Sequence, residues 1–212
     1  SFATSAHWSA YDASSTSGLA TKGYIGGVFD GRYIYFAPFY DGSAYHGKAL
    51  RYDTTASFTD SNSWSAYDAG TVSGLTITGF EGAVFDGRYV YFVDYSGGAS
   101  ANMVRYDTAA SFTTSGSWSA YDASSTGGLA TKGYIGAVFD SRYVYFVPAY
   151  DGTNRHARVL RYDTIASFTA AGSWAAYDAG NSGGLTNTKG FEGGVFDGRY
   201  VYFAPHHDGS AY

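Results

Sequence analysis

The sequence contains no cysteine and only 3 prolines among its 212 residues. The lack of cysteine excludes disulfide bonds, thiolate metal sites and cysteine nucleophiles. Charged residues make up only 15% of the chain, and its net charge of −5 argues against a nucleic-acid binder, which needs a basic patch for phosphates. No apolar run reaches the roughly 18 residues of a membrane span, and the first residues lack the basic and apolar regions of a signal peptide.

Aromatic side chains and glycine are abundant instead. The chain has 22 Tyr, 15 Phe, 4 Trp and 29 Gly. Disordered chains are poor in aromatics and rich in charge, and the glycines lack the period of three that collagen requires. Hydrophobic residues make up 45% of the sequence, enough for a packed core. These proportions predict a folded, β-rich protein.

An internal repeat of about 55 residues runs through the chain. The segment Trp-x-Ala-Tyr-Asp occurs four times, at intervals of 56, 54 and 56 residues. Its tryptophans are Trp8, Trp64, Trp118 and Trp174. The repeats cover about 1–56, 57–110, 111–166 and 167–212, and we expect them to form a single domain, 1–212. The simplest role for a residue that recurs once per repeat is packing between neighbouring repeats; a ring of sugar-stacking platforms is the alternative.

Each repeat predicts four short strands. In the first full repeat they cover 23–29, 32–36, 49–53 and 64–68. An Asp-Gly pair, Asp30-Gly31, separates the first two and favours a tight hairpin turn. No segment has a sustained 3.6-residue period between capping residues, so almost no helix is expected. Four strands per repeat of this length are typical of a β-propeller blade; a β-sandwich or barrel of about 16 strands is the alternative.

The repeat resembles those of β-propellers in its order of elements. An apolar strand is followed by an Asp-Gly turn, an aromatic strand and a strand ending in Arg-Tyr-Asp (51–53). In blade number the chain is similar to hemopexin-like four-bladed propellers. The resemblance covers the whole chain and implies an all-β fold, a β-propeller of four blades with four antiparallel strands each. The cysteine that usually closes hemopexin domains is absent. No functional residue of that family is carried over, because propellers host enzymes, lectins and scaffolds alike.

The sequence begins and ends partway through a set of four strands: it starts just before a fourth strand and ends just after a second strand. Arg-Tyr-Asp-Thr occurs three times, so the ends joined head to tail lack only one third strand. We expect one blade to be shared between the termini, with residues 8–12 in the same blade as residues 190–205. An open arc is the alternative, from a longer array or from two chains that form an eight-bladed ring. The unpaired edges of an incomplete blade would then favour a homo-oligomer.

Two glutamates stand out because they are the only ones in the protein. Glu81 and Glu192 occupy equivalent positions in the second and fourth repeats, just before the expected innermost strand. Blades two and four face each other across a four-bladed ring, so both carboxylates are expected near the channel mouth. With backbone carbonyls and water they could hold a hard cation, the only cofactor we expect. The alternative is that each accepts a hydrogen bond from a neighbouring blade.

The loops between the second and third strands vary most, and variable loops on a rigid scaffold are where binding usually occurs. Tyrosine rings stack on the apolar faces of sugars while carboxylates bind the hydroxyls. The predicted ligand-binding residues are Tyr40, Asp41, Tyr45, Tyr150, Asp151, Asp208 and Tyr212. The second repeat has Asp94-Tyr95-Ser96-Gly97 instead, so its pocket should be weak or absent. The alternative is that these tyrosines only cover blade edges.

Enzyme chemistry finds little support in the sequence. A phosphate-binding Gly-Lys-Ser/Thr loop and a His-Glu-x-x-His motif are both missing. We therefore expect a secreted or extracellular, lectin-like binding module that is not an enzyme and recognises carbohydrate or another polymer. A structural or self-assembling repeat protein without a small-molecule site is the main alternative, and a hydrolase fragment is a third.

Overall fold

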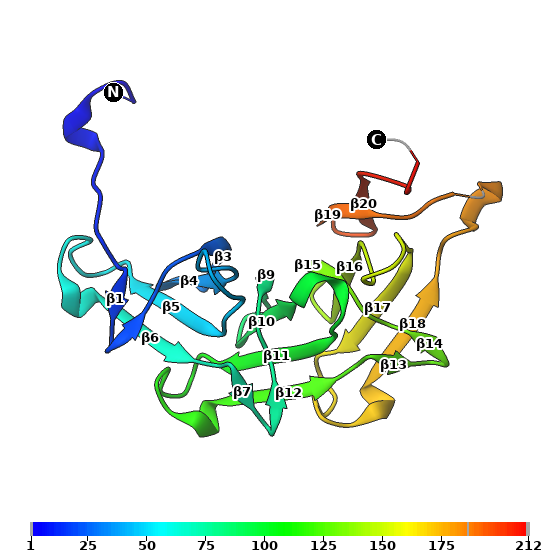
Figure 1. Ribbon diagram of the computed structural model, residues 1–212, viewed down its shortest axis with the longest axis horizontal. Coiled ribbons are helices and arrows are strands. Elements are labelled where there is room, and N and C mark those ends of the chain that lie inside the picture. Colours follow the sequence, from blue (N-terminus) through cyan, green and yellow to red (C-terminus); the bar gives the residue numbers. More distant parts are fainter. Residues whose placement is uncertain (1, 186, 211–212) are drawn as a thin grey trace.

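The computed structural model describes residues 2–185 and 187–210. Sheets of β-strands follow one another along an open arc, with the N-terminal segment at one end and the last strands at the other (Figure 1). In these ranges the only helical elements are 3-10 turns of three residues, η1 (Ser5–His7), η2 (Ser61–Ser63), η3 (Ser96–Gly98), η4 (Ser115–Ser117), η5 (Ala171–Ser173) and η6 (Ser182–Gly184). None of them could cross a membrane. The all-β prediction is confirmed.

Four sheets, named I to IV here, correspond to the repeats. Sheets I, II and III each contain four antiparallel strands in sequence order, and sheet IV contains two. Sheet I consists of β3 (Tyr24–Phe29), β4 (Tyr33–Pro38), β5 (Lys48–Asp53) and β6 (Trp64–Asp68). Sheet II consists of β9 (Phe80–Phe85), β10 (Tyr89–Asp94), β11 (Asn102–Asp107) and β12 (Trp118–Asp122). Sheet III consists of β15 (Tyr134–Phe139), β16 (Tyr143–Pro148), β17 (Arg158–Asp163) and β18 (Trp174–Asp178). Sheet IV consists of β19 (Phe191–Phe196) and β20 (Val201–Pro205).

Three small hairpins precede sheets I, II and III and were not predicted, because strands of two residues are too short for a periodic pattern. They are β1 (Ser15–Thr16) with β2 (Leu19–Ala20), β7 (Thr71–Val72) with β8 (Leu75–Thr76), and β13 (Ser125–Thr126) with β14 (Leu129–Ala130). The hairpin β7–β8 also touches sheet II, where the backbone N–H of Ala120 donates to the Ser73 hydroxyl at 3.2 Å. The hairpins therefore help to join one sheet to the next.

The Asp-Gly turns form between the first and second strands, as predicted. In sheet I the Asp30 carboxylate accepts hydrogen bonds from the backbone N–H groups of Arg32, at 2.8 Å, and Tyr33, at 2.6 Å. Gly31 has φ +102°, a left-handed conformation that glycine adopts at no steric cost. In sheet III Ser141 occupies this position with φ +82°. The turn thus keeps its shape where its preferred residue is missing.

The first strands of the four sheets lie side by side along the inner edge of the arc. Strand β9 contacts β3 on one side and β15 on the other, and β15 in turn contacts β19. Glycine permits this approach: a Cβ on Gly82 would lie only 3.1 Å from the Cα of Gly136. The first strand of each repeat therefore forms the inner edge of the arc.

Tryptophan fills the space between sheets, as the packing interpretation predicted. The Trp118 ring lies between Tyr67 of sheet I, at 4.9 Å, and Phe92 of its own sheet, at 5.6 Å. Its indole N–H donates to the carbonyl of Phe112 at 2.9 Å. Trp64 and Trp174 are buried in the same way. The recurrent tryptophans of sheets I to III are therefore structural.

A second recurrent contact between sheets combines Tyr, Phe and Arg. Tyr35 of sheet I is fully buried against Tyr106 and Phe112 of sheet II, with ring centroids 5.7 and 5.9 Å apart. The Arg51 guanidinium lies between the rings of Tyr33, at 4.2 Å, and Phe112, at 4.6 Å. Such cation–π contacts stabilise desolvated arginine by about 1–2 kcal/mol each. The Arg of Arg-Tyr-Asp is thus part of the packing.

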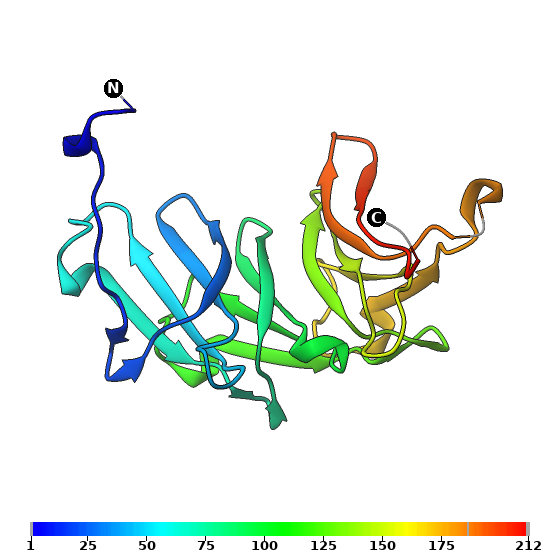
Figure 2. The ribbon, with the colours of Figure 1, turned by 45° about the horizontal axis from the view of Figure 1, so that its top comes forward.

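The prediction of a blade shared between the termini is wrong for this structure. Strands β19 and β20 pair only with each other among the described residues. Residues 8–12 belong to no sheet, and Tyr11 instead stacks on Trp64 of sheet I at 5.2 Å. The reason is physical: the third strand that would connect residues 8–12 to β20 has no counterpart in the sequence, whereas the stack on sheet I is available. The two ends of the arc stay apart (Figure 2).

Candidate functional site

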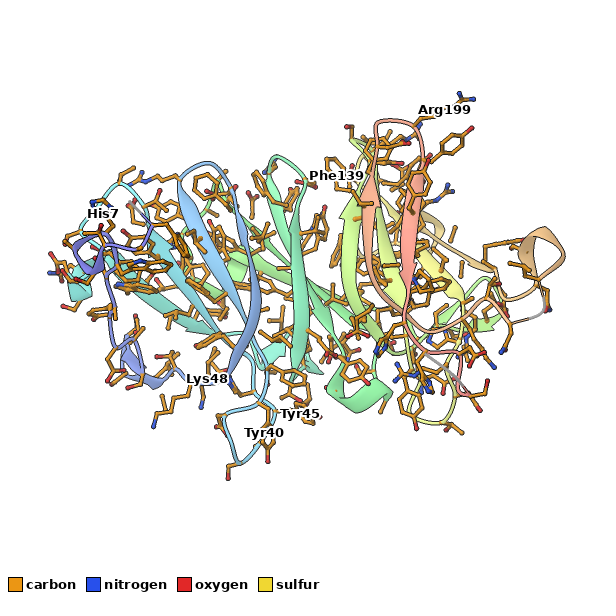
Figure 3. The ribbon with its side chains drawn as sticks, turned by 90° about the horizontal axis from the view of Figure 1, so that it is seen from above. His7, Tyr40, Tyr45, Lys48, Phe139 and Arg199 are labelled. Atoms are coloured by element: carbon orange, nitrogen blue, oxygen red, sulfur yellow. The ribbon has the colours of Figure 1, made fainter. Side chains whose placement is uncertain are left out.

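The loops that follow the second strands lie together on one side of the molecule. They comprise residues 39–47, 95–101, 149–157 and 206–210. Figure 3 shows Tyr40 and Tyr45 of the first loop on this side, and Phe139 and Arg199, next to the tight turns, on the opposite side. Strand alternation predicts this separation, because both ends of each hairpin cannot share a side.

The Asp-Gly sequence shapes these loops from within. In loop 39–47 the Asp41 carboxylate accepts hydrogen bonds from the N–H groups of Ser43 and Ala44, both at 2.9 Å. Tyr40 and Tyr45 then face each other across an isolated antiparallel bridge, with ring centroids 5.4 Å apart. Loop 149–157 repeats this design. The aspartate therefore fixes a turn that places two side chains next to each other.

The first three loops also reach over the start of the next sheet. The N–H of Gly79 donates to the His46 carbonyl at 3.1 Å, and the N–H of Gly190 donates to the His156 carbonyl at 3.1 Å. Gly79 has φ +75°, and a Cβ there would lie 2.7 Å from the Tyr45 ring. The loops consequently form the walls between neighbouring sheets on this side.

A cavity of about 530 Å³ opens between sheets III and IV. Its lining comes from the loops 149–157 and 206–210 and from the segment before β19. The lining residues are Tyr150, Thr153, Asn154, Arg155, Asn187, Lys189, His207, Asp208, Gly209 and Ser210. The cavity thus combines one aromatic ring with amides, hydroxyls and charges of both signs. All of these lining residues except Gly209 have side chains that can form hydrogen bonds.

A related cavity of about 460 Å³ lies between sheets I and II. Tyr45 and Thr78 line it at the positions where Arg155 and Lys189 line the 530 Å³ cavity. Its other lining residues correspond to those of a separate cavity of about 270 Å³ beside loop 149–157. The 460 and 530 Å³ cavities therefore correspond only in part, and no lysine or arginine lines the one between sheets I and II.

The two glutamates lie close to these loops. Glu81 on β9 is half-buried, and its Oε2 atom has no hydrogen-bond partner among the described residues. Burial, and then the negative charge of Glu192, raise the pKa of Glu81 from 4.5 to about 7, and the positive charge of Arg155 opposes the rise. Burial, and then the charge of Glu81, also raise the pKa of Tyr95. The predicted acid pair and the predicted ligand loops thus converge on one region.

Among the described residues, the structure places no third carboxylate beside the two glutamates, where a cation was predicted. Glu192 is exposed, and its Oε2 atom lies 2.9 Å from Nδ1 of His206. Within residues 2–185 and 187–210, no group of three or more His, Asp and Glu side chains could hold a metal ion. A hard cation takes six or more oxygen ligands. The cation therefore stays a prediction.

The predicted ligand residues occupy three different settings. Tyr150 and Asp208 line the cavity between sheets III and IV, and Tyr45 lines the one between sheets I and II. Tyr40 is exposed and packs on Tyr45. The carboxylates of Asp41, Asp151 and Asp208 accept hydrogen bonds within their own loops. Tyr212 lies outside the described residues.

Sequence reasoning missed Arg155, Asn187 and Lys189 as cavity residues. Arg155 could have been found, because it stands where the first repeat has Tyr45. Lys189 recurs as Lys22 and Lys132 and therefore looked like part of the scaffold. Its proximity to Arg155 depends on how loop 149–157 reaches the next sheet.

Two buried histidines were also missed, and both stabilise the loops. The Nε2 atom of His46 lies 2.6 Å from the Lys22 carbonyl, and its Nδ1 accepts from the N–H of Lys48 at 3.3 Å. His156 occupies the same position in sheet III, where burial lowers its pKa to about 4. His156 is therefore neutral at pH 7 and serves as a structural hydrogen-bonding group.

Loop 95–101 has its own buried anchor, Asp94, where the other repeats have proline. The Asp94 carboxylate is fully buried and accepts hydrogen bonds from the hydroxyls of Ser96, at 2.8 Å, and Ser100, at 2.5 Å. Burial raises its pKa to about 6. The different loop sequence of the second repeat thus produces a different internal support.

Comparison with known proteins adds little to this geometry. No protein family and no curated protein matches the sequence. One similar solved structure is PorZ, described as an essential bacterial surface component of the type-IX secretion system of human oral-microbiomic Porphyromonas gingivalis. The likeness has a TM-score of 0.43 and 11% identity and covers 87% of this chain. The chain spans about a quarter of that protein's length, 26%.

Proposed function

We propose that the four sheets are successive blades of a β-propeller and that the protein is a non-enzymatic module that binds carbohydrate or a similar polar polymer. The order of the sheets along the arc and the contact between their first strands support the propeller. The observation that carries the binding proposal is the cavity between sheets III and IV, where Tyr150 lies beside the amides of Asn154 and Asn187.

The chemistry of that cavity suits a sugar. An aromatic ring offers a surface for the apolar face of a pyranose, and amides can donate to and accept from neighbouring hydroxyls. Arg155 and Lys189 add donors that carry positive charge, so a sugar with an acidic substituent also fits this side of the cavity. A neutral sugar fits the related cavity with Tyr45 and Thr78 better, because no cation lines it.

Two related cavities on one rigid scaffold favour a polymer over a free monosaccharide. Neighbouring weak sites raise the overall affinity for a chain that reaches both, through effective concentration. Ligands of this kind occur at cell surfaces and in extracellular matrices, and we propose that the protein acts there.

A glycan array followed by calorimetry on the bound sugars tests this function. Tyr150→Ala should weaken binding at the cavity between sheets III and IV by about tenfold or more, as expected when an aromatic anchor is removed. Phe29→Ala removes an exposed aromatic side chain next to the tight turn on the opposite side and serves as the control. Equal affinities for wild type and Tyr150→Ala would exclude this cavity, and an array without any bound glycan would contradict the proposed function.

The same sugars provide the test for an enzyme. Incubation of each bound glycan with the protein, followed by analysis of reducing ends, should show no cleavage. If the wild-type protein releases shorter sugars and Glu81→Gln does not, the protein is a hydrolase and the proposal of a binding module is wrong.

A further inference from the structure

Each buried tryptophan occupies a slot between two aromatic rings. One ring is a tyrosine near the end of the preceding fourth-strand segment, and the other is a phenylalanine of the second strand of its own sheet. Trp64 lies between Tyr11 at 5.2 Å and Phe36 at 5.9 Å. The other two sandwiches are Tyr67–Trp118–Phe92 and Tyr121–Trp174–Phe146.

The same slot exists at sheet IV, but no tryptophan of the described residues fills it. Tyr177 at the end of sheet III and Phe203 of β20 are the equivalent rings, and both line a cavity of about 550 Å³. Tyr177 is 68% exposed, although its counterparts Tyr67 and Tyr121 are mostly covered by a tryptophan. The cavity is therefore a preformed socket for an indole.

A second vacancy lies in the same cavity. Between sheets I and II, Phe112 covers Tyr35 and Arg51. The equivalent residues of sheet III are Tyr145 and Arg161, and both line the 550 Å³ cavity. Arg161 stacks on Tyr143 at 4.2 Å, whereas Arg51 and Arg105 each lie over two rings. The cavity thus lacks a phenylalanine as well as a tryptophan.

The N-terminal segment carries both missing side chains and holds them in the required geometry. Phe2 is 84% exposed and Trp8 is 62% exposed. The indole N–H of Trp8 donates to the Phe2 carbonyl at 2.8 Å, and the two rings lie 5.1 Å apart. The corresponding values for Trp118 and Phe112 are 2.9 and 5.4 Å. The segment is therefore a preformed plug of the same type that fills the other slots.

We propose that residues Phe2–Asp12 of a second copy of this chain dock into this 550 Å³ cavity, which is separate from the 530 Å³ cavity of the proposed ligand site. Trp8 enters between Tyr177 and Phe203, and Phe2 covers Tyr145 and Arg161. The segment comes from a second copy because Tyr11 and Ala13 hold it against sheet I, at the opposite end of the arc from the cavity (Figure 1). Tyr11 keeps its place on Trp64, so docking also brings sheet I of one copy next to sheet IV of the other.

The resulting contact is head-to-tail. The donor surface and the acceptor surface are different parts of the chain, so the contact either closes into a ring or continues from copy to copy. Two copies that close a ring have about twice the chain mass of 22.6 kDa. The contact uses neither loop 149–157 nor loop 206–210, and it is independent of the proposed ligand site.

Analytical ultracentrifugation over a range of protein concentrations tests the proposal. The wild-type chain should associate, and Trp8→Ser and Tyr177→Ser should each raise the dissociation constant by about tenfold or more, since central aromatic anchors dominate interfaces. Both residues are exposed in the single chain, so both variants should fold. Ile165→Ser, which removes another exposed apolar side chain, should associate like the wild type.

Mixing the two variants supplies the decisive measurement. Trp8→Ser retains an intact socket and Tyr177→Ser retains an intact plug, so an equimolar mixture should form a complex although each variant alone does not. A wild-type chain that stays monomeric at every concentration would overturn the proposal, as would association that both substitutions leave unchanged or a mixture that stays monomeric.

Discussion

Replacing Glu81 with glutamine should change how the stability of the protein depends on pH. Burial and Glu192 raise the pKa of Glu81 from 4.5 to about 7 in the folded state. Between these values the folded chain binds more protons than the unfolded chain, so the free energy of unfolding falls as pH rises through this window. The rise in pKa corresponds to at most about 3 kcal/mol. Because Glu81 is only half-buried and solvent screens its charge, we expect a fall of about 1–2 kcal/mol.

Glutamine resembles the protonated carboxyl, so Glu81→Gln should lack this fall and be more stable than the wild type at pH 8 by about 1–2 kcal/mol. At pH 4 the two proteins should be nearly equal. Urea unfolding at both pH values measures the difference, at concentrations where the chain is monomeric. Glu192→Gln keeps Glu81 buried but removes the second charge, and it should remove only the smaller part of the effect. Parallel pH profiles for wild type and Glu81→Gln would refute the reasoning.

Two further predictions concern the scaffold, and both are measured as changes in the urea midpoint of the monomer. Ser141 has φ +82° at a turn position that is glycine in the other repeats, so Ser141→Gly should stabilise the fold by about 0.5–1 kcal/mol; a destabilised variant would mean that the serine side chain makes a contact that outweighs its backbone strain. Trp118→Ala should cost about 3–5 kcal/mol because the side chain is only 5% exposed. Trp8→Ala should change stability by less than about 0.5 kcal/mol; similar losses for both would contradict the assignment of Trp8 as an exposed plug.

The strands were predictable from the sequence because their signals are local and repeated. The Asp-Gly turns depend on hydrogen bonds within three residues, as between Asp30 and Tyr33, and the alternation of apolar side chains marks each strand. Four copies of the same pattern then make accidental matches improbable. The hairpins between repeats escaped prediction because each has only two-residue strands, which are held by contacts with the next sheet.

The candidate site was predictable only in outline. The variable loops line a cavity, but that 530 Å³ cavity also depends on Asn187 and Lys189, from the segment before β19, and the 550 Å³ cavity lies beside the tight turns instead. Their approach to loop 149–157 is set by hydrogen bonds between sheets, such as that from Gly190 to His156. The position of the N-terminal segment was mispredicted because the repeat spacing alone does not show whether this segment packs on sheet I or on sheet IV. The stack of Tyr11 on Trp64 holds it on sheet I.

The aromatic sandwiches have a consequence for how such chains can change in length during evolution. Each of these aromatic contacts across a sheet boundary joins a residue of one repeat to an equivalent partner in the next, so stability depends on nearest neighbours. Duplication of a unit of 54 to 56 residues therefore creates no unfamiliar interface: the new tyrosine meets a tryptophan, and the new tryptophan meets a phenylalanine, as before. Loops such as 149–157 can then diverge one copy at a time, because they take no part in these sandwiches. The architecture separates the inheritance of a scaffold from the acquisition of new specificities.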